Sequence, residues 1–195
     1  EKIFENIWIQ PAAGDAGGAI GSALSAWHLH HNKNRKINLG KDLMQGSFLG
    51  PEFSDLQIKD ELVSSGAVFK KLSNTNLVER VVSALIKKKA IGWMQGRMEF
   101  GPRALGARSI IADPRSPKMQ KQLNLKVKFR ESFRPFAHSV LREDVKDWFE
   151  YNNDSQYMLV VAEIRKDKRL TTTKKEEDLF GIDKLNVPRS TVPAI

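Results

Sequence analysis

The sequence at positions 96–109 reads GRMEFGPRALGARS. Three glycines and one proline fall within its first eleven residues, so this stretch forms a shaped loop and not a helix. It joins two apolar runs, 90–95 and 109–112, which are typical of buried strands. A strand, a glycine-rich loop and a second strand, followed by helical patterns, predict an α+β domain with α/β-like alternation in this half of the chain.

The loop carries three arginines, Arg97, Arg103 and Arg108. Each guanidinium offers a planar fork of N–H donors, and several of them converging on one place bind phosphate or carboxylate groups. Glu99 lies among them and has two interpretations. It is either a salt-bridge partner that orients an arginine or a contact for substrate hydroxyls or a metal.

A second basic cluster follows at positions 126–136, KVKFRESFRPF. Lys126, Lys128 and Arg130 alternate with apolar residues, which is the period of a strand with one basic face. We interpret Phe133 and Phe136 as core residues in preference to base-stacking platforms.

Further outward, strands and helices alternate. We expect strands at 3–10, 136–141 and 157–164. We expect helices at 19–30, 54–65, from Asn76 to the lysines at 87–89, 116–125 and 143–150. The helix at 54–65 begins with a capping-box pattern, and Asn76 with Glu79 suggests another.

The net charge is +9, and it is concentrated. Between Arg97 and Arg134 ten residues are Lys or Arg and three are Asp or Glu. Such a field favours an anionic partner, although a solvated basic face is the simpler alternative. The chain has no cysteine, which excludes disulfides and thiolate sites and fits a cytoplasmic protein. No apolar run is long enough to predict a membrane span.

Near the beginning, residues 11–18 read PAAGDAGG, a turn ahead of a helix rich in small residues. Gly14 and Gly17 would let backbone N–H groups approach a nucleotide phosphate at the helix N-terminus. Taken alone, Asp15 is better explained as an N-cap than as a contact for a ligand. We expect His28, His30 and His31 to be surface or capping residues, not metal ligands, and His138 to be a core residue.

The two motifs at 96–115 and 129–137, with PAAGDAGGAIG at 11–21, resemble the NodU/CmcH carbamoyltransferases of nodulation-factor and antibiotic tailoring. The likeness covers most of residues 7–164. Because the chain opens on Glu1 without Met and stops at Val192–Ile195, we expect it to be a fragment.

The resemblance implies two domains. Residues 1–50 would be the end of an actin- or sugar-kinase-like domain, its last strand–turn–helix, followed by a linker. Residues 51–195 would be a truncated YrdC-like domain, a twisted mixed sheet with helices. That domain would form carbamoyl-adenylate, and the other would move the carbamoyl group to a hydroxyl of a small-molecule acceptor.

By motif position the resemblance also implies the site residues. Those expected to act in the reaction are Arg103, Lys128 and Arg130. Those expected to hold the nucleotide and carbamoyl phosphate are Gly14, Gly17, Arg97, Arg108, Ser132 and Arg134. Asp15 would be the last ligand of a metal site whose histidines lie in the N-terminal part of the family.

The expected cofactors are ATP with Mg²⁺, and Fe²⁺ or another divalent metal in the full-length N-terminal site. The expected partners are carbamoyl phosphate and a hydroxylated acceptor, with no membrane partner and with a homodimer left open. One alternative is a nucleic-acid-binding YrdC-like module, which the lack of interleaved aromatics disfavours. A threonylcarbamoyl-adenylate synthase or hydrogenase-maturation protein is another.

Overall fold

The computed structural model of the chain describes residues 3–4, 7–36 and 42–194. The chain divides into two compact units. The first comprises residues 1–69, 93–109 and 155–160, and the second comprises 70–92, 110–154 and 161–195. Among the described residues, none of the helices has both the length and the apolar character needed to cross a lipid bilayer.

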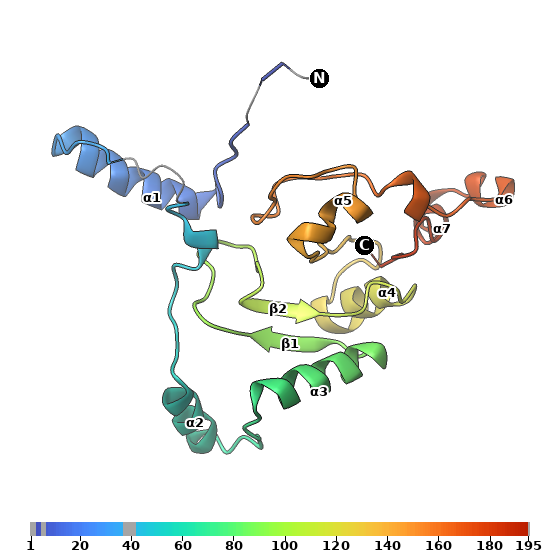
Figure 1. The fold of residues 1–195 in the computed structure, drawn as a ribbon, viewed down its shortest axis with the longest axis horizontal. Coiled ribbons are helices and arrows are strands. Elements are labelled where there is room, and N and C mark those ends of the chain that lie inside the picture. Colours follow the sequence, from blue (N-terminus) through green and yellow to red (C-terminus); the bar gives the residue numbers. More distant parts are fainter. Residues whose placement is uncertain (1–2, 5–6, 37–41, 195) are drawn as a thin grey trace. The chain divides into compact units, whose positions relative to one another are not determined.

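The first unit begins with a turn at residues 11–14 that leads into α1 (Asp15–Ser25) (Figure 1). α1 continues as the π-helical turn η1 (Ala26–His30), and a 3₁₀ turn, η2 (Gln45–Ser47), follows later. α2 (Asp55–Ser64) confirms its capping box, because Ser54 and Gln57 hydrogen-bond reciprocally. α1 and η1 together form the helix predicted at 19–30, and this helix begins four residues earlier than predicted, at Asp15.

The second unit begins with α3 (Asn74–Ile86), whose apolar residues fall at helical spacing as predicted. Its N-cap is Ser73 and not Asn76, so the second capping box is wrong. The Ser73 hydroxyl accepts from the Asn76 N–H, which places Asn76 inside the first turn.

The helix predicted at 116–125 begins later. α4 (Met119–Leu123) is capped by Lys118 and runs directly into the π-helical turn η3 (Asn124–Lys128). The region predicted as a helix at 143–150 contains η4 (Arg142–Asp144) and α5 (Val145–Trp148).

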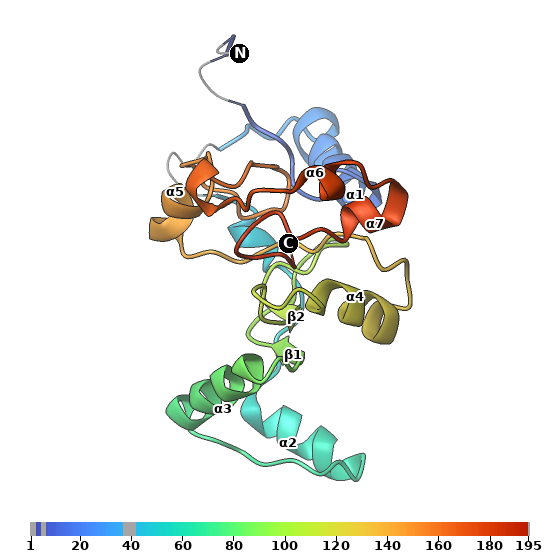
Figure 2. The ribbon, with the colours of Figure 1, turned by 90° about the vertical axis from the view of Figure 1, so that its right-hand side faces the viewer.

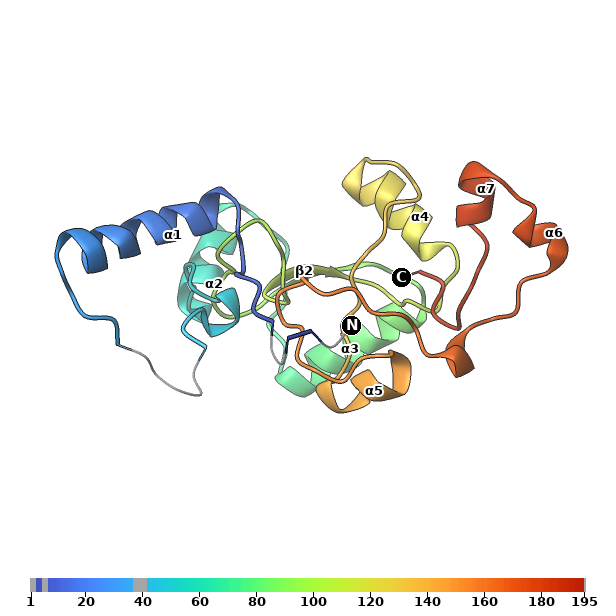
Figure 3. The same cartoon turned by 90° about the horizontal axis from the view of Figure 1, so that it is seen from above.

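The end of the chain adds η5 (Lys166–Lys168), α6 (Lys174–Glu177) and α7 (Gly181–Leu185). α6 and α7 lie next to each other in both Figure 2 and Figure 3. An antiparallel bridge between Arg169 and Ser190 closes this segment at its base.

Two of the predicted strands are confirmed. β1 (Ile91–Met94) and β2 (Arg108–Ile111) form a two-stranded sheet and run in opposite directions (Figure 1). The fold is thus a mixed α+β arrangement with several helices, as expected from the sequence.

The other predicted strands are wrong. Residues 3–4 and 7–10 have no strand structure, 5–6 lie outside the described residues, and 136–141 are extended without a ladder. In 157–164 only Ile164 pairs, with Phe149. The basic strand at 126–130 is replaced by η3, which ends at Phe129 in the left-handed conformation (φ 49°). Alternation of side chains predicted a strand there, but the backbone continues the helix of α4.

The buried apolar cluster of the second unit comprises Met119, Leu123 and Ala194, with Ala112 and Phe136 packed against it. It joins α4 to β2 and to the end of the chain, where the Ala194 N–H donates to the Pro114 carbonyl at 3.1 Å. The loop that carries Arg130 is therefore built directly on this core. The domain boundary at residue 50 stays a prediction.

Candidate functional site

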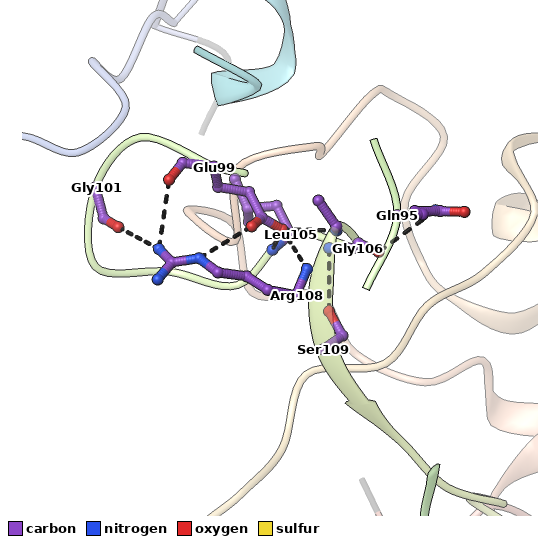
Figure 4. Close-up of polar contacts among 8 residues, drawn as sticks. Gln95, Glu99, Gly101, Leu105, Gly106, Arg108 and Ser109 are labelled. Atoms are coloured by element: carbon purple, nitrogen blue, oxygen red, sulfur yellow. Dashed lines mark hydrogen bonds and ion pairs between the residues drawn. The ribbon is translucent and has the colours of Figure 1, made fainter. Parts of the chain in front are cut away.

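The loop between β1 and β2, residues 95–107, is organised around one buried carboxylate. Glu99 is only 4% exposed. Its Oε1 accepts hydrogen bonds from the backbone N–H groups of Leu105 at 2.6 Å and Ala107 at 2.7 Å (Figure 4). A single side chain thus satisfies backbone donors that the loop cannot pair with its own carbonyls.

Arg108 closes the other side of this loop. Its Nε donates to Glu99 Oε2 at 3.1 Å, and its Nη2 donates to the Gly101 carbonyl at 2.8 Å (Figure 4). The salt-bridge interpretation of Glu99 is therefore confirmed. The contact of Arg108 with a phosphate stays a prediction. Because the Arg108 Nε already binds Glu99, only the part of the guanidinium that faces away from Glu99 can make this contact.

The protonation state of Glu99 follows from these contacts. Burial by itself would raise the pKa of this carboxyl, but hydrogen bonds from the backbone of Leu105, Ala107 and Arg108 outweigh it and lower the pKa. Glu99 is therefore ionised at neutral pH and pairs with Arg108 as a charge.

The turn at residues 11–14 packs against the tip of the same loop. A Cβ on Gly101, where φ is +98°, would lie 2.7 Å from the Ala12 Cβ. A Cβ on Gly17 would lie 2.4 Å from the Ala12 carbonyl oxygen, which accepts the Gly17 N–H at 2.8 Å. The first unit therefore brings the start of α1 and the arginine loop together.

Arg103 lies at this junction. With Pro11, Ala12, Phe100 and Tyr157 it lines a cavity of about 10 Å³. That is about the space of one water-sized sphere, so an anion would sit outside this cavity and not within it. Within the described part of the chain Arg103 has no carboxylate partner, whereas Arg97 lies 4.0 Å from Glu52. Arg103 is thus the arginine of this loop best placed to receive an anion.

The second basic cluster is organised around another buried polar residue, Asn124, which is 0% exposed. Its Oδ1 accepts the Arg130 Nε–H at 2.6 Å, and its Nδ2 donates to the carbonyls of Ser132 at 3.1 Å and Arg134 at 2.8 Å. The Arg130 guanidinium also lies over the Phe136 ring, 4.8 Å from its centroid. Phe136 packs on the core, so the prediction that it is a core residue is confirmed, whereas Phe133 is 42% exposed and its assignment to the core is wrong.

The remaining predicted residues of this cluster are exposed or partly exposed. Lys128 ends η3, and the Arg134 Nε lies 3.8 Å from Glu131. Ser132 contributes its carbonyl to Asn124, and its hydroxyl is the group that we predicted to donate to a phosphate. Lys128 and Arg134 thus flank Arg130 in the sequence, and Asn124 holds the guanidinium of Arg130.

The predicted site residues fall into both units. Six belong to the first unit: Gly14, Asp15, Gly17, Arg97, Arg103 and Arg108. Four belong to the second: Lys128, Arg130, Ser132 and Arg134.

Asp15 is the first residue of α1, and Gly14 is its N-cap without a side-chain hydrogen bond, so the N-cap interpretation of Asp15 is wrong. In the part of the chain that the structure describes, no three His, Cys, Asp or Glu side chains gather as a metal site. Asp15 can therefore supply one ligand but does not by itself fit a metal ion, and we route no chemical step through a metal here. His28 instead contacts the Lys33 carbonyl at 2.6 Å, as a surface residue would.

Two polar groups were not expected from the sequence. One is Asn124, near the end of the segment that we assigned to a helix. The other is the hydrogen bond from the Tyr157 hydroxyl to the Asp42 carboxylate. Burial raises the pKa of Tyr157 to about 12, and the bond to Asp42 acts in the same direction. No sequence pattern marks Asn124 as buried, and nothing in the sequence connects Asp42 with Tyr157.

A larger cavity of about 300 Å³ lies elsewhere in the second unit. It is lined mainly by apolar side chains of α3, Val82, Leu85 and Ile86, and by residues 112–115. It contains none of the predicted site residues, so the arginine loop in the first unit and the Arg130 loop in the second remain the two candidate binding loops.

The sequence profile described as "Carbamoyltransferase C-terminus" matches residues 82–194, more than half of the chain, and includes the arginine loop and the Arg130 loop. The chain belongs to this family. The resemblance found in the motifs is thereby confirmed.

Individual relatives agree with this membership. The carbamoyltransferase-family chain is 55% identical over its whole length to the uncharacterised protein sll1178 of Synechocystis, of which it covers 32%. It is 39% identical to the nodulation protein NolNO of Sinorhizobium fredii, over 86% of the chain and 24% of that protein. It is 33% identical to the uncharacterised protein MJ1058 of Methanocaldococcus jannaschii, over 84% of the chain and 27% of that protein. The chain thus spans a quarter to a third of these relatives.

Proposed function

We propose that this chain binds ATP and carbamoyl phosphate and forms carbamoyl-adenylate, for transfer to a hydroxyl of a small-molecule acceptor. One observation carries the proposal: two arginines, Arg103 and Arg130, are presented on loops that buried polar residues hold in shape. Glu99 holds the first loop and Asn124 the second. Preorganised cations of this kind suit a reaction between two anions.

The chemistry explains why positive charge is needed. After carbamoyl phosphate loses its phosphate to water, an oxygen of the resulting carbamate attacks the α-phosphorus of ATP, and pyrophosphate leaves. Nucleophile and phosphate repel each other until cations neutralise them along the line of attack. We assign that charge to Arg103 and Arg130, with Lys128 two residues before Arg130 in the sequence, and the binding of the phosphate oxygens to Arg97, Arg108, Ser132 and Arg134. The protein needs no nucleophile of its own, because positioning and electrostatics are sufficient.

We extend the proposal to the fold and to the rest of the reaction. Residues 51–195 are part of a YrdC-like domain, and residues 1–50 end an actin-like domain that performs the transfer. When bound, Mg²⁺ would neutralise the phosphates of ATP. A divalent metal held by Asp15, with ligands from outside this chain, would serve the transfer step. Gly14 and Gly17 would admit the nucleotide phosphate to the start of α1, and the reaction would take place in the cytoplasm.

The test is exchange of labelled pyrophosphate into ATP by the protein expressed at the full length of its gene. We expect exchange that requires carbamoyl phosphate. Exchange that requires threonine and bicarbonate instead, or no exchange with carbamoyl phosphate, would overturn the proposal. Residues 1–195 alone should not carbamoylate an acceptor, so robust transfer by this piece would contradict the assignment of the transfer step to another domain.

A further inference from the structure

We propose that Asn124 is the positioning residue of Arg130: it fixes which edge of the guanidinium faces the anion. This inference rests on the proposed function for its role in catalysis, but its geometric part stands alone. Asn124 is fully buried at the point where α4 passes into η3.

The contacts of Asn124 are specific to the Arg130 loop. Its Oδ1 accepts the Arg130 Nε–H at 2.6 Å, and its backbone carbonyl accepts the Arg130 N–H at 3.0 Å. Its Nδ2 donates to the carbonyls of Ser132 and Arg134. The Asn124 side chain therefore holds both Arg130 and the loop residues that follow it, Ser132 and Arg134.

These contacts determine the direction of the guanidinium. With Nε held by Asn124 and one face on Phe136, the end that carries Nη1 and Nη2 is left to point outward. Nη2 makes one long contact of 3.5 Å with the Pro135 carbonyl, which a stronger acceptor could replace. An oxyanion can then be bound end-on, through the two Nη groups. A guanidinium that rotates freely would lose this preference.

The chain also provides a matched control. Gln120, one turn earlier on α4, donates through Nε2 to the carbonyls of Phe133 and Arg134, both at 3.2 Å. It supports the same loop but makes no contact with Arg130. Replacing Gln120 therefore tests loop support alone, while replacing Asn124 removes loop support and the hold on Arg130.

The geometric test reads the Arg130 Nε–H signal by ¹⁵N NMR of arginine-labelled protein without substrates. We expect a signal protected from solvent exchange in the wild type and in Gln120→Ala, and its loss in Asn124→Ala. A signal that persists in Asn124→Ala, or that is lost in Gln120→Ala as well, overturns the inference whether or not the enzyme is active.

The functional test is kcat/KM for carbamoyl phosphate in pyrophosphate exchange. Asn124→Ala should lower it on the order of 10- to 100-fold, because a displaced cation loses the aligned geometry. Gln120→Ala should lower it much less, and Asn124→Ala combined with Arg130→Ala should be no worse than Arg130→Ala alone. Equal losses in Asn124→Ala and Gln120→Ala, or additive losses in the double variant, would show a merely structural role. If the wild type shows no exchange while the NMR result holds, the proposed function fails and the orienting role of Asn124 remains.

Discussion

Glu99 and Arg108 form an ion pair that closes the arginine loop on itself, with the Arg108 Nε 3.1 Å from Glu99 Oε2. The Glu99 side chain is completely buried, while that of Arg108 is 36% exposed. A buried carboxylate holds its backbone donors and its arginine together only while all of them remain in place. The shape of the loop that carries Arg103 therefore depends on Glu99.

Glu99→Gln should destabilise the protein. The amide keeps one oxygen for the N–H groups of Leu105 and Ala107, but it turns an NH₂ toward the Arg108 Nε–H, and two donors then face each other. We expect a loss of about 1–3 kcal/mol in the free energy of unfolding, measured by urea denaturation. Glu131→Gln is the matched control, since the exposed pair of Glu131 with Arg134 should contribute little. An equal effect of the two substitutions would contradict the central role of Glu99.

The stability of this loop should depend on pH in acid. The folded pKa of Glu99 lies below its usual 4.5, so the unfolded state binds the proton more readily. The contribution of Glu99 is therefore fully present above about pH 4.5 and is lost as the pH falls through its folded pKa. The difference in the free energy of unfolding between the wild type and Glu99→Gln, measured by urea denaturation from pH 7 to pH 3, isolates this contribution. A difference that grows on acidification would contradict the sign.

Gly101→Ala should also destabilise the first unit. Gly101 has φ +98°, which alanine adopts only under strain, and the new methyl group would lie 2.7 Å from the Ala12 Cβ. The expected loss is about 1–3 kcal/mol, measured by thermal unfolding. Gly92→Ala is the control, because a Cβ there meets nothing within 4 Å. If both variants unfold alike, the contact between the turn and the loop does not contribute to stability.

Asp15→Asn should separate the two reactions that we propose. Asp15 begins α1, where its charge stabilises the helix by about 0.3–1 kcal/mol, so the fold should be retained. We expect normal pyrophosphate exchange and loss of transfer to the acceptor in the full-length protein. Loss of exchange together with transfer would assign Asp15 to the nucleotide site instead.

The sequence predicted those elements whose signal is local. The Ser54 and Gln57 capping box, the apolar spacing of α3 and the glycines that separate β1 from β2 each act within a few residues. The failed strands lack such a signal. At 126–130 the alternation of basic and apolar residues matched a strand, but α4 continues through this segment because the loop after it is anchored on Asn124.

The site was predictable to a similar degree. Motif reasoning identified the arginines and left the role of Glu99 open, and the structure resolves it as a salt bridge. The groups that hold those arginines depend on three-dimensional contacts. Asn124 and the pair of Tyr157 with Asp42 emerge only when the chain is folded, because a partner across many residues leaves no periodic pattern.

The most direct test of the account is carbamoyl phosphate-dependent pyrophosphate exchange in Arg103→Ala and Arg130→Ala, each in the full-length protein. We predict that each substitution lowers the exchange rate about 100-fold or more, because each removes a cation that neutralises the reacting phosphates in the proposed reaction. Arg80→Ala, an exposed arginine on α3, should exchange like the wild type. Near-normal exchange in both loop variants, with the fold intact, would contradict the assignment of Arg103 and Arg130 to the site.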